Sequence, residues 1–240
     1  MSTLDDPVRA ALLGPHAHLA RRHGTALAYP ADVSPFAAPP GDATGWADLA
    51  VLIGDGEVVL PHLHVDPPRG WTVFATIPGV QMVASNLDTD LDAAADPAAV
   101  RLGPADVPAM AALVAATRPG PFRERTIALG TYLGIRDGDR LVAMAGERIH
   151  PPGFTEISAV CTDPAYRGRG LAARLVLAIV AGIRARGEAP FLHAAADNVA
   201  AIRLYERLGF RHRAGTPFVA VRAAAGTVAP DPAGQLQRTP

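Results

Sequence analysis

The segment that most constrains this chain runs from Val160 to Ala173, with the sequence VCTDPAYRGRGLAA. It has the order of a strand, a short basic loop with two glycines, and the start of a helix. Glycine lets the backbone approach a ligand closely, and the first turn of a helix presents unpaired N–H groups. Arg167 and Arg169 add charge-assisted hydrogen bonds suited to phosphate. The segment therefore predicts a site for a pyrophosphate.

Composition and charge exclude several classes of protein. The chain has 240 residues, 49% of them hydrophobic, so it is long and apolar enough for one large domain or two small ones. Its formal net charge is -1 at pH 7. Such a charge gives no general attraction to nucleic acid or to an anionic membrane. No apolar run is long enough to cross a bilayer, and residues 1–14 lack a signal-peptide core. We expect a cytoplasmic protein without nucleic-acid or membrane partners, either monomeric or homodimeric.

Cysteine and histidine give no signal for a disulfide or a metal. The single cysteine, Cys161, excludes an internal disulfide and fits a reducing compartment. Two histidine pairs, His16 with His18 and His62 with His64, have the spacing of one strand face. No acid or cysteine joins them at the spacing of a zinc site. We therefore expect no metal.

The chain divides at an acidic, alanine-rich segment, residues 87–97. Residues 1–97 are interpreted as a smaller N-terminal α/β region, in which 46–60 are expected to form two short strands. Residues 227–240 have the composition of a flexible tail. Between them, in 98–226, strands are expected at 100–102, 131–136, 140–149, 155–162, 191–195, 210–213 and 218–222, and helices at 104–117, 171–186 and 198–208. This order predicts an α/β (α+β) fold with a mixed sheet flanked by helices.

Two nucleotide-binding patterns compete for the glycine loop. Residues 168–173 match the dinucleotide fingerprint G-x-G-x-x-A, which would indicate an oxidoreductase. In that fingerprint the first glycine follows the strand almost directly, whereas residues 163–167 intervene here. The acid expected about 20 residues later is also misplaced, because Glu188 precedes the next strand and Asp197 lies too far along. The spacing disfavours a dinucleotide.

In the other frame, residues 167–172 (RGRGLA) fit the pattern R/Q-x-x-G-x-G/A. A second segment, residues 198–210 (NVAAIRLYERLGF), fits N-x-x-A-x-x-L-Y-x-x-x-G-F on the following helix. With both segments in this order, the chain resembles the GNAT superfamily of acyl-CoA-dependent N-acyltransferases, in a form with an extra N-terminal half. The resemblance covers about 100–222, and residues 1–97 are compatible with a degenerate half of the same fold.

The resemblance implies roles for particular residues. Asn198 would contact the pantetheine or cap its helix, and Tyr205 would protonate the departing CoA thiolate, since a phenol stays protonated at neutral pH. Tyr205 could instead be a core tyrosine. The backbone of Val160, Cys161 and Thr162 would line the pantetheine arm, and Arg167, Gly168, Arg169, Gly170, Leu171, Ala172 and Ala173 would surround the pyrophosphate.

The acceptor amine must lose a proton, so a base is needed. Glu156 is the first candidate, because it precedes Arg167 by the interval at which several family members place a base glutamate. It shares a strand face with Ser158, Val160 and Thr162 unless a bulge intervenes near Val160. Glu147 and His150 are the second choice. The alternative for Glu156 is an ion pair with Arg148 across the hairpin.

These observations predict an N-acetyltransferase that moves an acetyl group from acetyl-CoA to the primary amine of a small molecule or peptide. Transfer would be direct, within a ternary complex. Two other functions stay open: a non-catalytic sensor that binds acyl-CoA, and, less favoured by the spacing, a dinucleotide-dependent oxidoreductase. The acceptor would be selected by residues 117–125, by residues 151–155 and by the N-terminal half.

Overall fold

The computed structural model describes residues 2–84 and 96–224. The tail expected at 227–240 and most of the segment at 87–97 lie outside these ranges. The helices are α1 (Pro7–Leu12), α2 (Ala43–Ile53), α3 (Val107–Thr117), α4 (Leu171–Ala185) and α5 (Val199–Arg207), with 3-10 turns η1 (Ala17–Leu19), η2 (Pro104–Asp106), η3 (Thr126–Leu129) and η4 (Pro164–Tyr166). The strands are β1 (Arg21–His23), β2 (Ala26–Ala28), β3 (Glu57–Pro61), β4 (Trp71–Ile77), β5 (Gly79–Ala84), β6 (Val100–Arg101), β7 (Tyr132–Asp137), β8 (Arg140–Glu147), β9 (Phe154–Thr162), β10 (Ala189–Ala195), β11 (Phe210–Gly215) and β12 (Phe218–Ala223).

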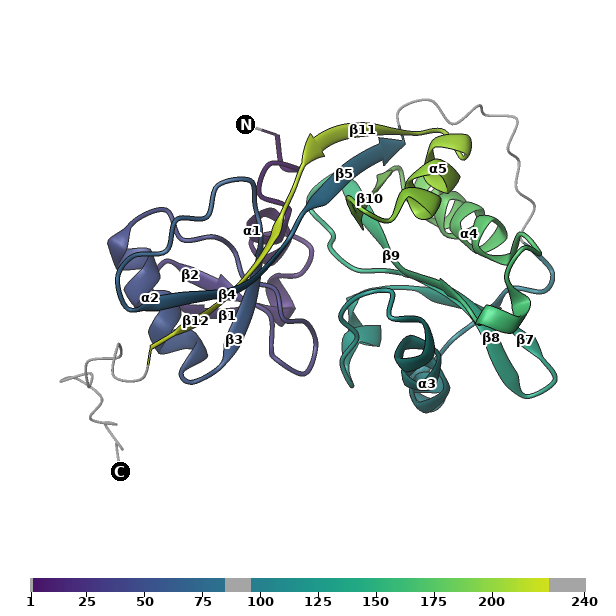
Figure 1. The fold of residues 1–240 in the computed structure, drawn as a ribbon, viewed down its shortest axis with the longest axis horizontal. Coiled ribbons are helices and arrows are strands. Elements are labelled where there is room, and N and C mark those ends of the chain that lie inside the picture. The colour runs from purple at the N-terminus through teal and green to yellow at the C-terminus, as the bar shows by residue number, and fades with distance from the viewer. Residues whose placement is uncertain (1, 85–95, 225–240) are drawn as a thin grey trace.

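The described strands form a large mixed sheet, a small three-stranded antiparallel sheet and the two-stranded pair β1-β2, and the molecule has two lobes (Figure 1). The large sheet has the order β11-β5-β10-β9-β8-β7-β6, and only β9 and β10 run parallel. The small sheet has the order β3-β12-β4. The mixed sheet with its flanking helices confirms the predicted fold class.

The two lobes exchange strands. β5, from the N-terminal part of the chain, lies between β10 and β11 in the large sheet. β12, the last of the described strands, lies between β3 and β4 in the small sheet. Strands therefore cross the predicted division at residue 97 in both directions, and that division into units stays a prediction.

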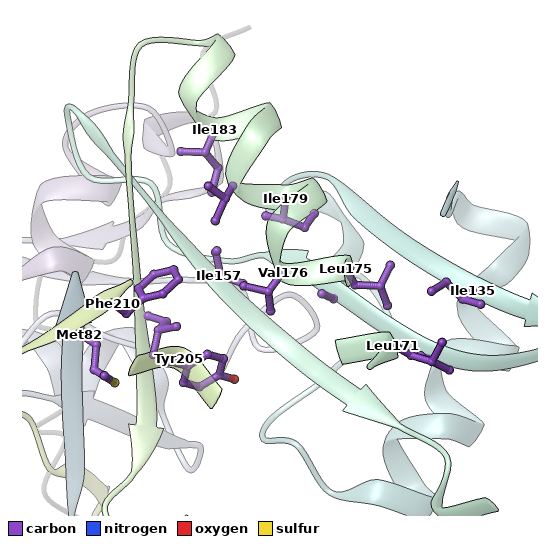
Figure 2. Packing of buried hydrophobic residues seen from close by; sticks show 14 of the residues in the cluster. Met82, Ile135, Ile157, Leu171, Leu175, Val176, Ile179, Ile183, Tyr205 and Phe210 are labelled. Carbon is purple, nitrogen blue, oxygen red and sulfur yellow. The ribbon is translucent and has the colours of Figure 1, made fainter. Parts of the chain in front are cut away.

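The main core lies between α4 and the large sheet (Figure 2). Leu175, Val176, Ile179 and Ile183 of α4 are buried at the 3.6-residue spacing of one helix face. They pack with Ile157 and with residues of the neighbouring strands. This packing fixes the first turn of α4 beside the end of β9.

One predicted element is wrong. Residues 46–60 were expected as two strands, but 43–53 form the helix α2 and only β3 follows. The Asp42 side chain accepts a hydrogen bond from the Gly45 N–H at 2.8 Å and caps the helix. Trp46, Leu49 and Ala50 then repeat at helical spacing and are buried. The stretch is almost continuously apolar, so its helical period is hard to distinguish from that of strands.

Candidate active site

The site lies where β9 and β10 separate. The two strands pair only from Phe154 to Ile157 on β9, opposite residues 189–192 on β10. Beyond that point β9 carries a bulge, because the pairing with β8 shifts register between Met144 and Gly146. Ala159 adopts a left-handed φ of 52° there. The bulge breaks the alternation that would put Glu156 on one face with Val160, and it turns the end of β9 away from β10.

A cavity of about 730 Å³ occupies this gap. It runs along the end of β9 and the start of α4, past α5, to residues of the small sheet. Of the predicted site residues, eleven line it: Val160, Cys161, Thr162, Arg167, Gly168, Gly170, Leu171, Ala172, Ala173, Asn198 and Tyr205. Arg169 and Glu156 do not. Arg169 instead packs its guanidinium carbon 4.7 Å from the centre of the Tyr166 ring.

The glycine loop has the conformation that close approach of a phosphate requires. Gly168 and Gly170 have φ of 76° and 75°, a region that residues with a Cβ rarely enter. A Cβ added at either position would meet no atom within 4 Å. The space beside the first turn of α4 is therefore open. Its unpaired N–H groups and Arg167 are suited to a pyrophosphate.

The end of β9 is suited to an extended polar arm. Its edge toward β10 carries no strand pairing beyond Ile157. The buried hydroxyl of Thr162 has no hydrogen-bond partner in the part of the chain that the structure describes. A pantetheine arm beside this edge would supply amide partners for such groups. These residues therefore fit acyl-CoA, which would place its thioester toward α5.

Tyr205 is buried in the main core and also lines the cavity. Its ring packs 6.1 Å from the Phe210 ring, and Figure 2 shows its oxygen pointing away from Phe210. Burial, with a smaller contribution from Cys161, raises the pKa of Tyr205 to about 12. The phenol is therefore protonated at neutral pH and able to donate a proton. Asn198 accepts a hydrogen bond from the Ala201 N–H at 3.2 Å, so it caps α5 while it lines the cavity.

Glu156 lies in a buried ion pair, which is the alternative weighed from the sequence. Its carboxylate accepts two hydrogen bonds from Arg148, at 2.8 and 2.5 Å, and one from His193 at 2.7 Å. Burial alone would raise the pKa of Glu156, but Arg148 and then His193 lower it to about 2. The side chain is fully buried. The carboxylate does not line the cavity, so the geometry does not favour it as the base.

The orientation of the His193 ring is fixed by its neighbours. Arg213 donates to Gln81 Oε1 at 2.8 Å, so the amide nitrogen of Gln81 is the donor toward His193 Nε2 at 3.1 Å. His193 Nε2 therefore accepts, and its Nδ1–H donates to Glu156. Both ring nitrogens of His193 therefore have hydrogen-bond partners.

The residues of the second choice for the base, Glu147 and His150, also lie outside the cavity lining. Glu147 binds Arg186 at 2.8 Å and the Thr131 N–H at 2.9 Å. His150 Nε2 lies 3.7 Å from Glu147, and burial lowers the pKa of His150. Neither residue lines the cavity. No Asp or Glu is found among the described residues of its lining.

Several cavity residues had no sequence signal. Phe36, Val59 and Ile77 come from the N-terminal half, and Phe218 from β12. They come from segments distant in sequence from the glycine loop, and no local pattern reveals that these segments meet at the cavity. Arg148 was identified only as a partner of Glu156. Of the two segments expected to select the acceptor, 117–125 contributes residues 117–121 to the lining and 151–155 contributes none; their role in selection stays a prediction.

Two further properties concern the described residues, 2–84 and 96–224. None of their helices has the length and hydropathy of a membrane span. Within the same ranges, no three histidine, cysteine or acidic side chains are grouped as metal ligands.

Comparison with known proteins gives the family. Residues 132–219 match the model of FR47-like proteins. A solved structure from the GNAT acetyltransferase family, from Novosphingobium aromaticivorans, is 41% identical, covers 93% of this chain and 100% of its own, and has a TM-score of 0.84. The mycothiol acetyltransferase of Saccharopolyspora erythraea is 39% identical over 82 residues, 34% of this chain and 27% of its own. The N-alpha-acetyltransferase RimI of Mycobacterium tuberculosis is 40% identical over 83 residues, 33% of this chain and 51% of its own.

The chain thus spans between a quarter and about half of the length of these two curated relatives. The Novosphingobium structure, by contrast, is matched over its whole length, the N-terminal half included. Together with the separated strands and the glycine loop, this match confirms the resemblance seen in the sequence: the chain belongs to the GNAT family of N-acetyltransferases.

Proposed function

We propose that this protein transfers the acetyl group of acetyl-CoA to a primary amine, directly within a ternary complex. The observation that carries the proposal is one continuous cavity. It joins the glycine loop and the β9 bulge, which suit the donor, to Tyr205 and then to a wall from the N-terminal half. We assign the N-terminal half the role of shaping the acceptor end. The single buried thiol of Cys161 fits a reducing compartment such as the cytoplasm.

In the proposed reaction the amine nitrogen attacks the thioester carbonyl carbon. The carbon–nitrogen bond forms, the carbon–sulfur bond breaks, and Tyr205 donates its proton to the departing sulfur. The loop 167–173 holds the pyrophosphate and orients the thioester. Because the described lining offers no carboxylate, we assign the amine proton to solvent water rather than to Glu156.

The test combines binding and turnover. Calorimetric titration with acetyl-CoA, with NADH as the control, is expected to show binding of acetyl-CoA only. Release of CoA thiol is then followed across a panel of primary amines. Tyr205→Phe is expected to lower kcat by about 10²–10⁴-fold and to leave acetyl-CoA affinity unchanged. Absence of acetyl-CoA binding would overturn the proposal. Binding without acetylation of any amine would identify a sensor, and binding of NADH alone an oxidoreductase.

A further inference from the structure

The acceptor end of the cavity has an apolar wall. Phe36 and Phe218 lie with ring centroids 6.1 Å apart, and Val59 pairs with Phe36 in an isolated bridge. Ile77, at the end of β4, is 53% exposed. All four residues line the cavity, and three of them belong to the N-terminal half. Such a wall buries an apolar side chain favourably.

One guanidinium lies beside this wall in a fixed position. Arg148 directs Nε and Nη2 at Glu156, and its guanidinium carbon lies 4.8 Å from the centre of the Phe36 ring. These contacts on two sides leave it little freedom. Its charge is balanced by Glu156, so the pair presents hydrogen-bonding capacity to the cavity rather than a bare charge.

The remaining nitrogen of Arg148, Nη1, is available to a ligand. Within the described parts of the chain, no protein atom bonds to it. In the same parts of the chain, the buried polar side-chain atoms without a hydrogen-bond partner are Tyr132 Oη, His150 Nε2 and Thr162 Oγ1. Nη1 is not one of them, so it is not buried. Since Arg148 lines the cavity, Nη1 is exposed there and offers N–H groups to an oxygen atom.

The charge of the cavity lining disfavours the binding of polycationic acceptors. Besides Arg148, its charged residues are Arg118, Arg167 and Arg207, and no acid is present in the described lining to compensate a second ammonium group. A site without counter-charges disfavours polyamines by repulsion.

We propose that Arg148 determines acceptor specificity: its Nη1 binds a carbonyl or carboxylate oxygen next to the acceptor amine, while the wall of Phe36, Val59, Ile77 and Phe218 takes an apolar side chain. The inference rests on the proposed function. The acceptor class is an α-amino compound with an apolar side chain, either a free amino acid or the N-terminal residue of a peptide.

Matched acceptors test the oxygen without any change to the protein. Phenylalaninamide and phenylalanine retain a carbonyl or carboxylate, and 2-phenylethylamine lacks it. For at least one of the first two compounds, the expected kcat/KM is about tenfold higher than for 2-phenylethylamine. This ratio corresponds to the loss of one charge-assisted hydrogen bond. A higher rate with phenylalaninamide and short peptides identifies a peptide acceptor, and a higher rate with phenylalanine a free amino acid. Equal rates for all three would overturn the role of Arg148.

A pair of exposed variants tests the wall. Ile77→Ser is expected to raise KM for apolar acceptors several-fold and to leave acetyl-CoA affinity unchanged. Val73→Ser is the matched control, because Val73 is on the same strand, is 44% exposed and does not line the cavity. Equal effects of the two substitutions, or faster acetylation of spermidine than of phenylalaninamide, would overturn the apolar class. Absence of any acetylated amine would instead reject the proposed function, so the two failures are distinguishable.

Discussion

Replacement of Glu156 by Gln separates a structural role of this residue from a catalytic one. The substitution removes the charge that compensates Arg148, whose side chain is 9% exposed. Loss of one partner of a buried pair costs about 3–5 kcal/mol. The pKa gives a similar figure: a shift from 4.5 to about 2 corresponds to about 3 kcal/mol at 1.36 kcal/mol per unit. That is a large part of the stability of a typical domain, about 5–15 kcal/mol.

The assay is equilibrium unfolding in urea followed by circular dichroism. Glu156→Gln is expected to lower the free energy of unfolding by about 3 kcal/mol. Asp32→Asn is the matched control, since Asp32 and Arg125 form a pair whose side chains are 45% and 57% exposed. Its expected cost is below about 1 kcal/mol. The reasoning fails if Glu156→Gln unfolds like the wild type yet loses kcat and the acidic limb of its pH profile, because Glu156 would then be the base.

The same ion pair sets a pH dependence. The folded-state pKa of Glu156 lies below its unfolded value, so its stabilising contribution is complete above about pH 4.5 and is lost as the pH falls toward 2. Unfolding free energies measured across this range are expected to decrease in the wild type and to decrease less in Glu156→Gln. Parallel curves for the two proteins would contradict the lowered pKa.

Two further predictions concern the cavity. Gly170→Ala forces a residue with a Cβ into a left-handed φ, a strain of about 1–2 kcal/mol. It is expected to weaken acetyl-CoA binding by about tenfold in calorimetry. Gly138→Ala, with φ of 57° in the β7–β8 turn, is the control and should leave binding unchanged; equal effects of the two variants would refute the role of the loop. Burial raises the pKa of Cys161 to about 11, so alkylation by iodoacetamide at pH 7.5 is expected to be much slower than for a free thiol; a rate like that of a model thiol would contradict this burial.

The elements that the sequence predicted are the local ones. The strands predicted at 131–136 and 140–149 correctly placed the β7–β8 hairpin, and the glycine loop correctly placed the start of α4. In each case residues within one turn of each other determine the conformation. The helix α2 was missed because its apolar run obscured the period. The order of the sheets was not predictable, since β5 and β12 pair with strands distant in sequence.

The candidate site divides in the same way. Its donor end lies in two continuous segments with recognisable spacing, and eleven of the thirteen predicted residues line the cavity. The end that we propose for the acceptor is assembled from Phe36, Val59, Ile77 and Phe218, each in a different element or loop. Glu156 occupies the predicted strand position, but its function depends on Arg148 and His193, which only the folded sheet brings to it.

The exchange of strands also constrains the order in which the nascent chain can complete its structure. In the sheet order β3-β12-β4, β3 and β4 are not neighbours, and the strand between them ends at Ala223. Synthesis proceeds from the N-terminus at about 5–20 residues per second. The small sheet therefore stays without its middle strand until residues 218–223 have left the ribosome. Pairings this distant in sequence slow folding. A chain released early would expose two unpaired apolar strands to aggregation and proteolysis.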